Sequence, residues 1–200
     1  MNKIVCFFAL MLVAGLFQVA AHERKPRRVL KPARFACVAK GNDTTGFYNF
    51  NLTDIDGNKI SLGQFRGKKI LFINTASNSN YTSQYASLER LYQKYKDSLV
   101  IIAMPSNSFG HEGGDNATIK NFVKNTYGVH YILAQKTIVA GDNQSPLYGW
   151  LTHIEQNHMM SNTIQRDFYK FLVNGAGRLV GAFVSSVDPM SNDMQSAVSN

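Results

Sequence analysis

The alternation of hydrophobic and polar positions predicts an ordered domain that begins at Phe47. Two short apolar runs, 69–74 and 99–104, have continuous hydrophobic centres, which is typical of strands buried on both faces of a sheet. Between them, apolar residues recur at helical spacing and predict a helix over 85–96. Two parallel strands need a crossover of this kind, so we expect a parallel α/β core.

The flanking segments complete the predicted order of elements. Alternating runs at 50–52 and 60–62, joined by Asp56-Gly57, predict a hairpin. The later elements expected are a helix capped by Asn116, a helix opened by Pro146, a hairpin of 168–173 and 179–184, and a short C-terminal helix. This order predicts a thioredoxin-like α/β sandwich. Its site should lie at the carboxyl end of the sheet, in the loop 75–83.

The N-terminal residues have the character of a targeting segment. Lys3 precedes an uncharged apolar run over 4–20, and Val19-Ala20-Ala21 offers the small residues that a signal peptidase requires. The pattern predicts a signal peptide at 1–21 and a secreted or periplasmic protein. Because the run is nearly long enough to span a bilayer, an uncleaved membrane anchor is the alternative. The basic residues that follow the run disfavour easy export.

Most of the positive charge lies in a predicted flexible arm, residues 22–46, which shows no sustained periodicity. The net charge is +8, of which residues 22–40 contribute +6 and Lys3 contributes one. The predicted domain, 47–200, is therefore nearly neutral, so we expect no specific binding of nucleic acid. The arm is either a solvated leader or a contact for anionic lipid, glycan or an acidic protein surface.

The sequence contains two cysteines, Cys6 in the predicted signal and Cys37 in the arm. A mature chain with Cys37 alone has no internal disulfide and no multi-thiolate metal site. A dimer linked through Cys37 and a free or capped thiol both remain open. No cofactor is expected.

Five sequence blocks, in order, resemble the glutathione peroxidase family over residues 47–189. The blocks are Asp54-Ile55-Asp56-Gly57 with Ser61-Leu62, Asn74-Thr75-Ala76-Ser77 with Thr82-Ser83-Gln84-Tyr85, Pro105-Ser106-Asn107-Ser108-Phe109-Gly110, Asn143 to Tyr148, and Phe168 to Val173. The resemblance implies a thioredoxin-like fold of the glutathione peroxidase type and a thiol- or selenol-dependent reduction of peroxides.

The residues that the family uses for this reaction are replaced. By the resemblance, the reactive cysteine or selenocysteine corresponds to Ser79, and the family's glutamine, tryptophan and asparagine correspond to Ser108, Arg166 and Asp167. The cysteine often found in the second loop corresponds to Ser106, and the resolving cysteine of thioredoxin-dependent members corresponds to Val123.

These replacements predict a degenerate site. Peroxide reduction needs a thiolate or selenolate that attacks a peroxide oxygen and is itself oxidised, which a serine hydroxyl does not provide. We therefore expect an exported binding or scaffold protein with an unidentified protein or small-molecule partner. The alternative is an active thiol peroxidase, dependent on glutathione or thioredoxin, that uses Cys37 or an unconventional site.

Two other kinds of chemistry, hydrolysis and metal binding, need residue types that this sequence also contains. Ser79 with His111 and Glu112 would suit a hydrolase, but no Gly-x-Ser-x-Gly turn is present, so a polar filling residue is the simpler interpretation. The histidines do not supply a complete set of metal ligands, so no metal is predicted. Arg166 is expected either to pair with Asp167 or Glu112, or to admit an anionic ligand.

Overall fold

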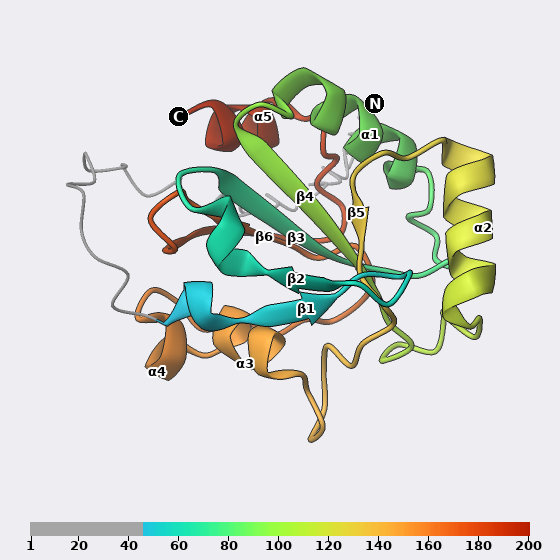
Figure 1. Ribbon diagram of the computed structural model, residues 1–200, viewed down its shortest axis with the longest axis horizontal. Helices are drawn as coiled ribbons and strands as arrows, with labels where there is room; N and C mark the ends of the chain where they lie inside the picture. The colour runs from blue at the N-terminus through green and yellow to red at the C-terminus, as the bar shows by residue number, and fades with distance from the viewer. Residues whose placement is uncertain (1–45) are drawn as a thin grey trace, which may run out of the picture. The chain divides into compact units, whose positions relative to one another are not determined.

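The fold is built on a mixed sheet of five strands in the order β5-β4-β3-β6-β7 (Figure 1). The computed structural model describes residues 46–200. The predicted signal peptide, 1–21, and all but the last residue of the predicted arm, 22–46, lie outside this range. Among the described residues, no helix combines the length and the apolar character needed to cross a bilayer.

The strands pair in the way that the crossover requires. β3 is parallel to β4 and antiparallel to β6, β4 is parallel to β5, and β6 and β7 form a hairpin. The sheet strands are β3 (Lys69–Thr75), β4 (Leu99–Pro105), β5 (Ile132–Leu133), β6 (Lys170–Val173) and β7 (Leu179–Phe183), and the separate hairpin is β1 (Asn51–Thr53) with β2 (Lys59–Ser61). The predicted parallel core and both predicted hairpins are confirmed.

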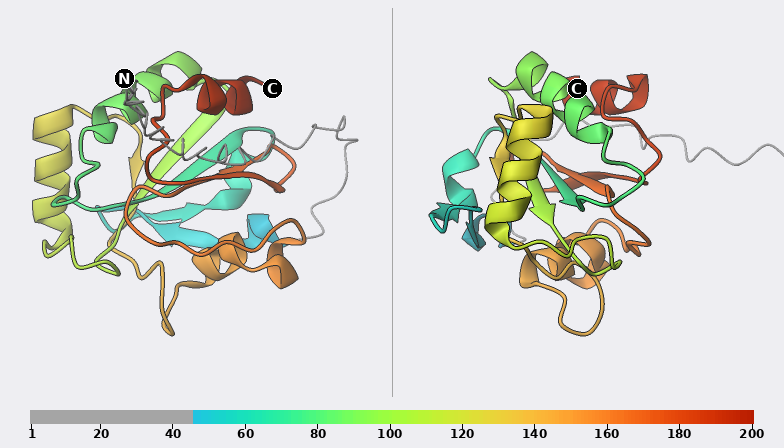
Figure 2. Two further views of the ribbon diagram at one scale, coloured as in Figure 1. Left: turned by 180° about the vertical axis from the view of Figure 1, so that it is seen from behind. Right: turned by 90° about the vertical axis from the view of Figure 1, so that its right-hand side faces the viewer.

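Helices cover both faces of the sheet. α1 and α5 lie together on one side, and α3 and α4 lie on the opposite side (Figures 1 and 2). The helices are α1 (Gln84–Tyr95), α2 (Asn116–Tyr127), α3 (Pro146–Thr152), α4 (Ile154–Asn157) and α5 (Asn192–Ser199), with short 3-10 turns η1 (Phe47–Asn49) and η2 (Leu62–Phe65).

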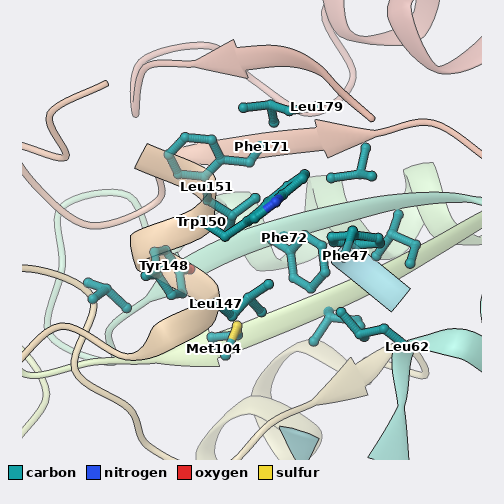
Figure 3. Packing of buried hydrophobic residues seen from close by; sticks show 14 of the residues in the cluster. Phe47, Leu62, Phe72, Met104, Leu147, Tyr148, Trp150, Leu151, Phe171 and Leu179 are labelled. Atoms are coloured by element: carbon teal, nitrogen blue, oxygen red, sulfur yellow. The ribbon is translucent and has the colours of Figure 1, made fainter. Parts of the chain in front are cut away.

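The central strand β3 is buried on both faces, as its continuous apolar sequence predicts. Ile70 and Phe72 belong to a cluster on the α3 side of the sheet, and Leu71 and Ile73 belong to a cluster that includes residues of α1, α2 and α5. Figure 3 shows the first cluster, with Phe72 at its centre. The ring centroids of Phe47 and Phe72 lie 6.0 Å apart, within the range of favourable edge-to-face packing.

Two details of the predicted elements are wrong. The residue that caps α2 is Asp115, whose side chain accepts a hydrogen bond from Thr118 N–H, and Asn116 is the first helical residue. The last hairpin begins at Lys170 because Phe168 has a φ of 60°, which is incompatible with a regular strand. β5 and α4 were not predicted, since two and four residues carry too little periodicity to be recognised.

Candidate functional site

Three loops meet at the carboxyl ends of β3 and β4, where the sequence predicts the site. The loop after β3 is joined to the loop after β4 by Asn78 N–H, which donates to the His111 carbonyl at 3.1 Å. Asn74, near the end of β3, holds the segment that leads into β6. Its amide nitrogen donates to the Arg166 carbonyl at 3.1 Å, and its amide oxygen accepts from Tyr169 N–H at 3.0 Å.

Glu112 is a buried carboxylate that fixes the first loop to the second. Its side chain is buried with 1% of the residue exposed, and its Oε2 accepts from both the backbone N–H and the hydroxyl of Ser77, each at 2.8 Å. The backbone N–H of Glu112 donates to Asn107 Oδ1 at 3.0 Å. Hydrogen bonds of this kind satisfy a buried charge, which is otherwise costly. Glu112 is therefore held by Ser77.

His111 and Asp167 form the second polar pair of the site. His111 Nδ1 lies 2.6 Å from Asp167 Oδ2, with the histidine side chain 50% exposed and the aspartate side chain 1% exposed. The next residue, Phe168, has the positive φ noted above and is fully buried. A left-handed conformation is unfavourable for a bulky side chain. Here it turns Asp167 into the site while the Phe168 ring enters the core cluster beside α1.

The floor of the site is polar and incompletely hydrogen-bonded. Within residues 46–200, Asp167 Oδ1 is buried without a hydrogen-bond partner, and the buried hydroxyls of Thr75 and Tyr85 lie beside one another. Burial raises the pKa of Tyr85 well above its usual value, and the carboxylates of Glu112 and Asp167 raise that pKa further. The site beneath the loops is therefore acidic.

Ser79 lies in this region as a component of a turn. The residue is buried, with 7% exposed, and its hydroxyl oxygen accepts a hydrogen bond from Tyr81 N–H at 3.3 Å. Its backbone carbonyl accepts from Thr82 N–H at 3.3 Å, just before α1 begins. Such local bonds are typical of serine in turns. The hydroxyl thus has a structural role in the approach to α1.

Ser108 and Ser106 bind one another and the opposite segment of the chain. Ser106 Oγ donates to Ser108 Oγ at 3.0 Å, and Ser108 Oγ accepts from Val139 N–H at 3.1 Å. Ser108 is consequently occupied by contacts within its own loop and with Val139. Val123, which the sequence resemblance aligns with a resolving cysteine, is fully buried in the apolar cluster that includes residues of α1, α2 and α5.

The expected ion pair of Arg166 is not formed. The Arg166 residue is exposed, and in the described part of the chain no salt bridge involves it. Asp167 is occupied by His111, and Glu112 is occupied by Ser77, so both predicted partners are bound elsewhere. The prediction of internal pairing is therefore wrong, and the guanidinium is exposed to solvent.

The arrangement does not assemble a hydrolase site from Ser79, His111 and Glu112. Across residues 46–200, no hydrogen bond joins Ser79 to His111 or Glu112, and Ser79 Oγ instead bonds Tyr81. The same residues contain no group of three or more histidine, cysteine, aspartate or glutamate side chains placed to hold a metal ion. Cys37 lies outside the described residues.

Two features of the site were not found from the sequence. The His111–Asp167 pair joins residues far apart in the chain, which no local pattern reveals. Lys170 is the second, since it lies within an apolar strand and is fully buried. Its Nζ donates to the Phe168 carbonyl at 2.8 Å, and burial lowers its pKa from 10.5 to about 7.

The sheet order, the crossover helix between parallel strands and the helices on both faces define a thioredoxin-like protein. Comparison with known proteins places the chain within that class. The glutathione peroxidase family model matches residues 47–152, more than half of the chain. The chain belongs to the glutathione peroxidase family, an oxidoreductase family, and the resemblance expected from the sequence is confirmed.

Individual relatives agree with this assignment. The glutathione peroxidase-like peroxiredoxin gpx1 of Schizosaccharomyces pombe is 36% identical over 76% of this chain and 98% of its own length. The hydroperoxy fatty acid reductase gpx1 of Synechocystis is 35% identical over 76% of this chain and 93% of its own. The crystal structure of Trgpx in its apo form matches with a TM-score of 0.59 and 29% identity, covering 76% of this chain and 92% of that one.

Proposed function

We propose that this chain is an exported member of the family that has lost peroxide reduction at the family's site and acts as a binding or scaffold protein. The observation that carries the proposal is Ser79, which stands where the family has a cysteine or selenocysteine. Its hydroxyl is un-ionised at neutral pH and has no oxidised state comparable to a sulfenic acid.

The surroundings of Ser79 support the same proposal. Ser108 is bonded to Ser106 and Val139, Asp167 is bonded to His111, and Arg166 is exposed. By the resemblance, Ser108, Arg166 and Asp167 replace the three family residues that assist the reactive atom. The side chains at these positions are hydrogen-bonded to other residues of the chain or exposed to solvent. This arrangement fits a domain that is retained for binding and not for catalysis.

A steady-state assay tests the proposal. We would measure consumption of hydrogen peroxide and of a lipid hydroperoxide, with glutathione or thioredoxin as the reductant, for the parent chain and for Cys37→Ser. We expect both proteins to be indistinguishable from background. Turnover by the parent chain would contradict the proposal, and its survival in Cys37→Ser would place the activity outside that thiol.

An active thiol peroxidase is the second candidate, because the relatives are named peroxidases, peroxiredoxins and a hydroperoxide reductase. In this chain the reaction would need Cys37 as the attacking thiolate or an unconventional site. The first case is recognised by turnover in the parent chain that disappears in Cys37→Ser.

The exposed guanidinium of Arg166 suggests an anionic ligand for the altered site. We would compare the melting temperature of the parent chain and of Arg166→Ala in the presence of phosphate, sulfate and citrate at constant ionic strength. Stabilisation that is lost in Arg166→Ala supports this ligand class. An unchanged melting temperature of the parent chain would rule out such a ligand.

The basic arm, 22–40, is proposed to contact an anionic surface. We would compare binding to vesicles that contain phosphatidylserine, at low and at physiological salt, for the mature chain and for a variant in which the basic residues of the arm are replaced by glutamine. A salt-sensitive loss of binding in the variant is expected. Equal binding of the two proteins would contradict the role of the arm.

A further inference from the structure

A cavity of about 390 Å³ opens between β1 and the segment that leads from β5 to α3. Its volume is within the range of ligand pockets. None of the residues that correspond to the family's catalytic positions lines it, and none of its lining residues is charged. The lining residues are Asn49, Phe50, Asn51, Leu52, Thr53, Met104, Ala134, Gln135, Thr137, Ser145, Pro146 and Leu147.

One wall of the cavity is the outer edge of β1. Phe50 carbonyl accepts from Leu62 N–H at 3.0 Å and Asp54 N–H donates to the Asn58 carbonyl at 2.8 Å, so both face the inner edge, toward β2. Backbone groups alternate between the two edges along an antiparallel strand. The register therefore turns the N–H and carbonyl of Asn51 to the outer edge, on the side of the cavity.

Pairing along this outer edge stops at the cavity. Gln135 N–H donates to the Thr53 carbonyl at 3.0 Å, beside an antiparallel bridge between Asp54 and Ala134. Two residues further on, Thr137 N–H donates to the Pro105 carbonyl at 2.9 Å, in β4. The segment thus leaves β1 at the point where its next partner would be Asn51, and the cavity opens at this divergence.

The remaining walls leave room for side chains. Ser145 Oγ lines the cavity and, within residues 46–200, is buried without a hydrogen-bond partner. Phe50 and Pro146 also line a second hollow of about 450 Å³, whose wall includes Asp142 and His153 beside Gln144 and Gln156. Among residues 46–200, the first cavity therefore combines a strand edge without a pairing strand at Asn51 with neutral amide and hydroxyl groups, and the second hollow, which contains Asp142, lies beside it.

We propose that this cavity binds an extended, uncharged peptide segment of a partner protein, which pairs with the outer edge of β1 at Asn51. A strand edge supplies affinity through backbone hydrogen bonds, and the first cavity beside it, whose lining carries no charge, accepts a side chain of the bound segment. A charged side chain placed here would lose its hydration without gaining an opposite charge, so the segment must be neutral. The inference stands whether or not the domain reduces peroxides.

The experiment uses the mature chain labelled with ¹⁵N and three libraries of capped hexapeptides. One library contains uncharged residues, the second contains the same residues with alternate backbone amides N-methylated, and the third carries two charged residues in each peptide. Binding is measured by fluorescence polarisation and located by amide shifts. The variants are Gln135→Trp, at the rim of the cavity, and Asn125→Trp, an exposed control in α2.

We expect peptides of the uncharged library to shift the amide signals of Asn51 and Thr53. Binding should weaken on the order of tenfold or more in Gln135→Trp and remain unchanged in Asn125→Trp. N-methylation should abolish binding, because it removes the donors that pair with a strand edge. The inference is overturned if no uncharged peptide shifts these amides, if the N-methylated library binds equally well, or if charged peptides bind as tightly.

Discussion

On our proposal, Ser79 carries an oxygen where the family's chemistry requires sulfur or selenium, and the two buried carboxylates of the adjoining loops add to the effect of this replacement. Glu112 and Asp167 are both buried at the same site. Burial raises the pKa of Tyr85, and the two carboxylates each raise it further. An acidic environment disfavours a thiolate for the same reason. Restoring the cysteine is therefore not expected to restore the family's reactivity.

This expectation can be measured in a protein that begins at His22 and carries Cys37→Ser, where a new cysteine is the only thiol. Ser79→Cys should react slowly with hydrogen peroxide, and Ser79→Cys combined with Asp167→Asn should react faster. The thiolate fraction changes about tenfold for each unit by which the thiol pKa shifts. The rate of oxidation is followed by mass spectrometry. Equal rates in the two proteins would show that Asp167 does not influence this position.

Lys170 gives the fold a dependence on pH. Burial lowers its pKa from 10.5 to about 7 in the folded protein, so between these values the unfolded chain binds more protons. The free energy of unfolding should therefore rise as the pH increases from 7 toward 10.5. One pKa unit corresponds to ~1.4 kcal/mol, so we expect a gain of about 1 to 3 kcal/mol between pH 7 and pH 9.

Denaturant unfolding of the parent chain and of Lys170→Met, at intervals between pH 6.5 and pH 9.5, measures this gain. The methionine fills similar volume without an ionisable group, so the part of the pH dependence that belongs to Lys170 should disappear. Parallel pH profiles for the two proteins would assign the dependence to other groups.

At the scale of the elements, the turn between β6 and β7 is fitted against the loop that precedes β3. Gly67 N–H donates to the Gly175 carbonyl at 2.9 Å, and Tyr48 OH donates to the same carbonyl at 2.7 Å. A Cβ atom on Gly175 would lie 2.6 Å from the Gly67 carbonyl oxygen. The Gly67 carbonyl belongs to the backbone and cannot rotate out of the way as a side chain could. The turn at Gly175 would therefore have to move away from Gly67.

Gly175→Ala is therefore expected to reduce the free energy of unfolding by about 1 to 3 kcal/mol, as overpacking of a close contact does. Gly113→Ala is the matched control, since a Cβ atom there meets nothing within 4 Å. Urea unfolding of both variants and of the parent chain measures the difference. Equal stability of the two variants would contradict the close approach of the turn to Gly67.

The elements also show what the sequence alone can predict. β3 and α1 were predicted because their burial produces a regular pattern over seven and twelve residues. The cap of α2 was misassigned because Asp115 and Asn116 are adjacent and both are favourable capping residues. The pairs His111–Asp167 and Ser77–Glu112 could not be predicted, since they depend on how three loops meet after the sheet has formed.

For the whole molecule, family membership and chemistry at the site lead to different expectations. The chain covers nearly the full length of relatives that are named peroxidases or peroxiredoxins, and its sheet and crossover helix position the same loops. Within those loops, Ser79, Ser108 and Asp167 are hydrogen-bonded to other residues of this chain and Arg166 is exposed, at the positions that the sequence resemblance aligns with the family's catalytic residues. We infer that the scaffold has been retained for binding.

The most direct test is the rate of hydroperoxide consumption by the purified mature chain, measured beside the glutathione peroxidase-like peroxiredoxin gpx1 of Schizosaccharomyces pombe with thioredoxin or glutathione as the reductant. Our account predicts that the relative, named a peroxiredoxin, consumes hydroperoxide while this chain does not exceed the uncatalysed rate. Sustained, reductant-dependent turnover by this chain would contradict it.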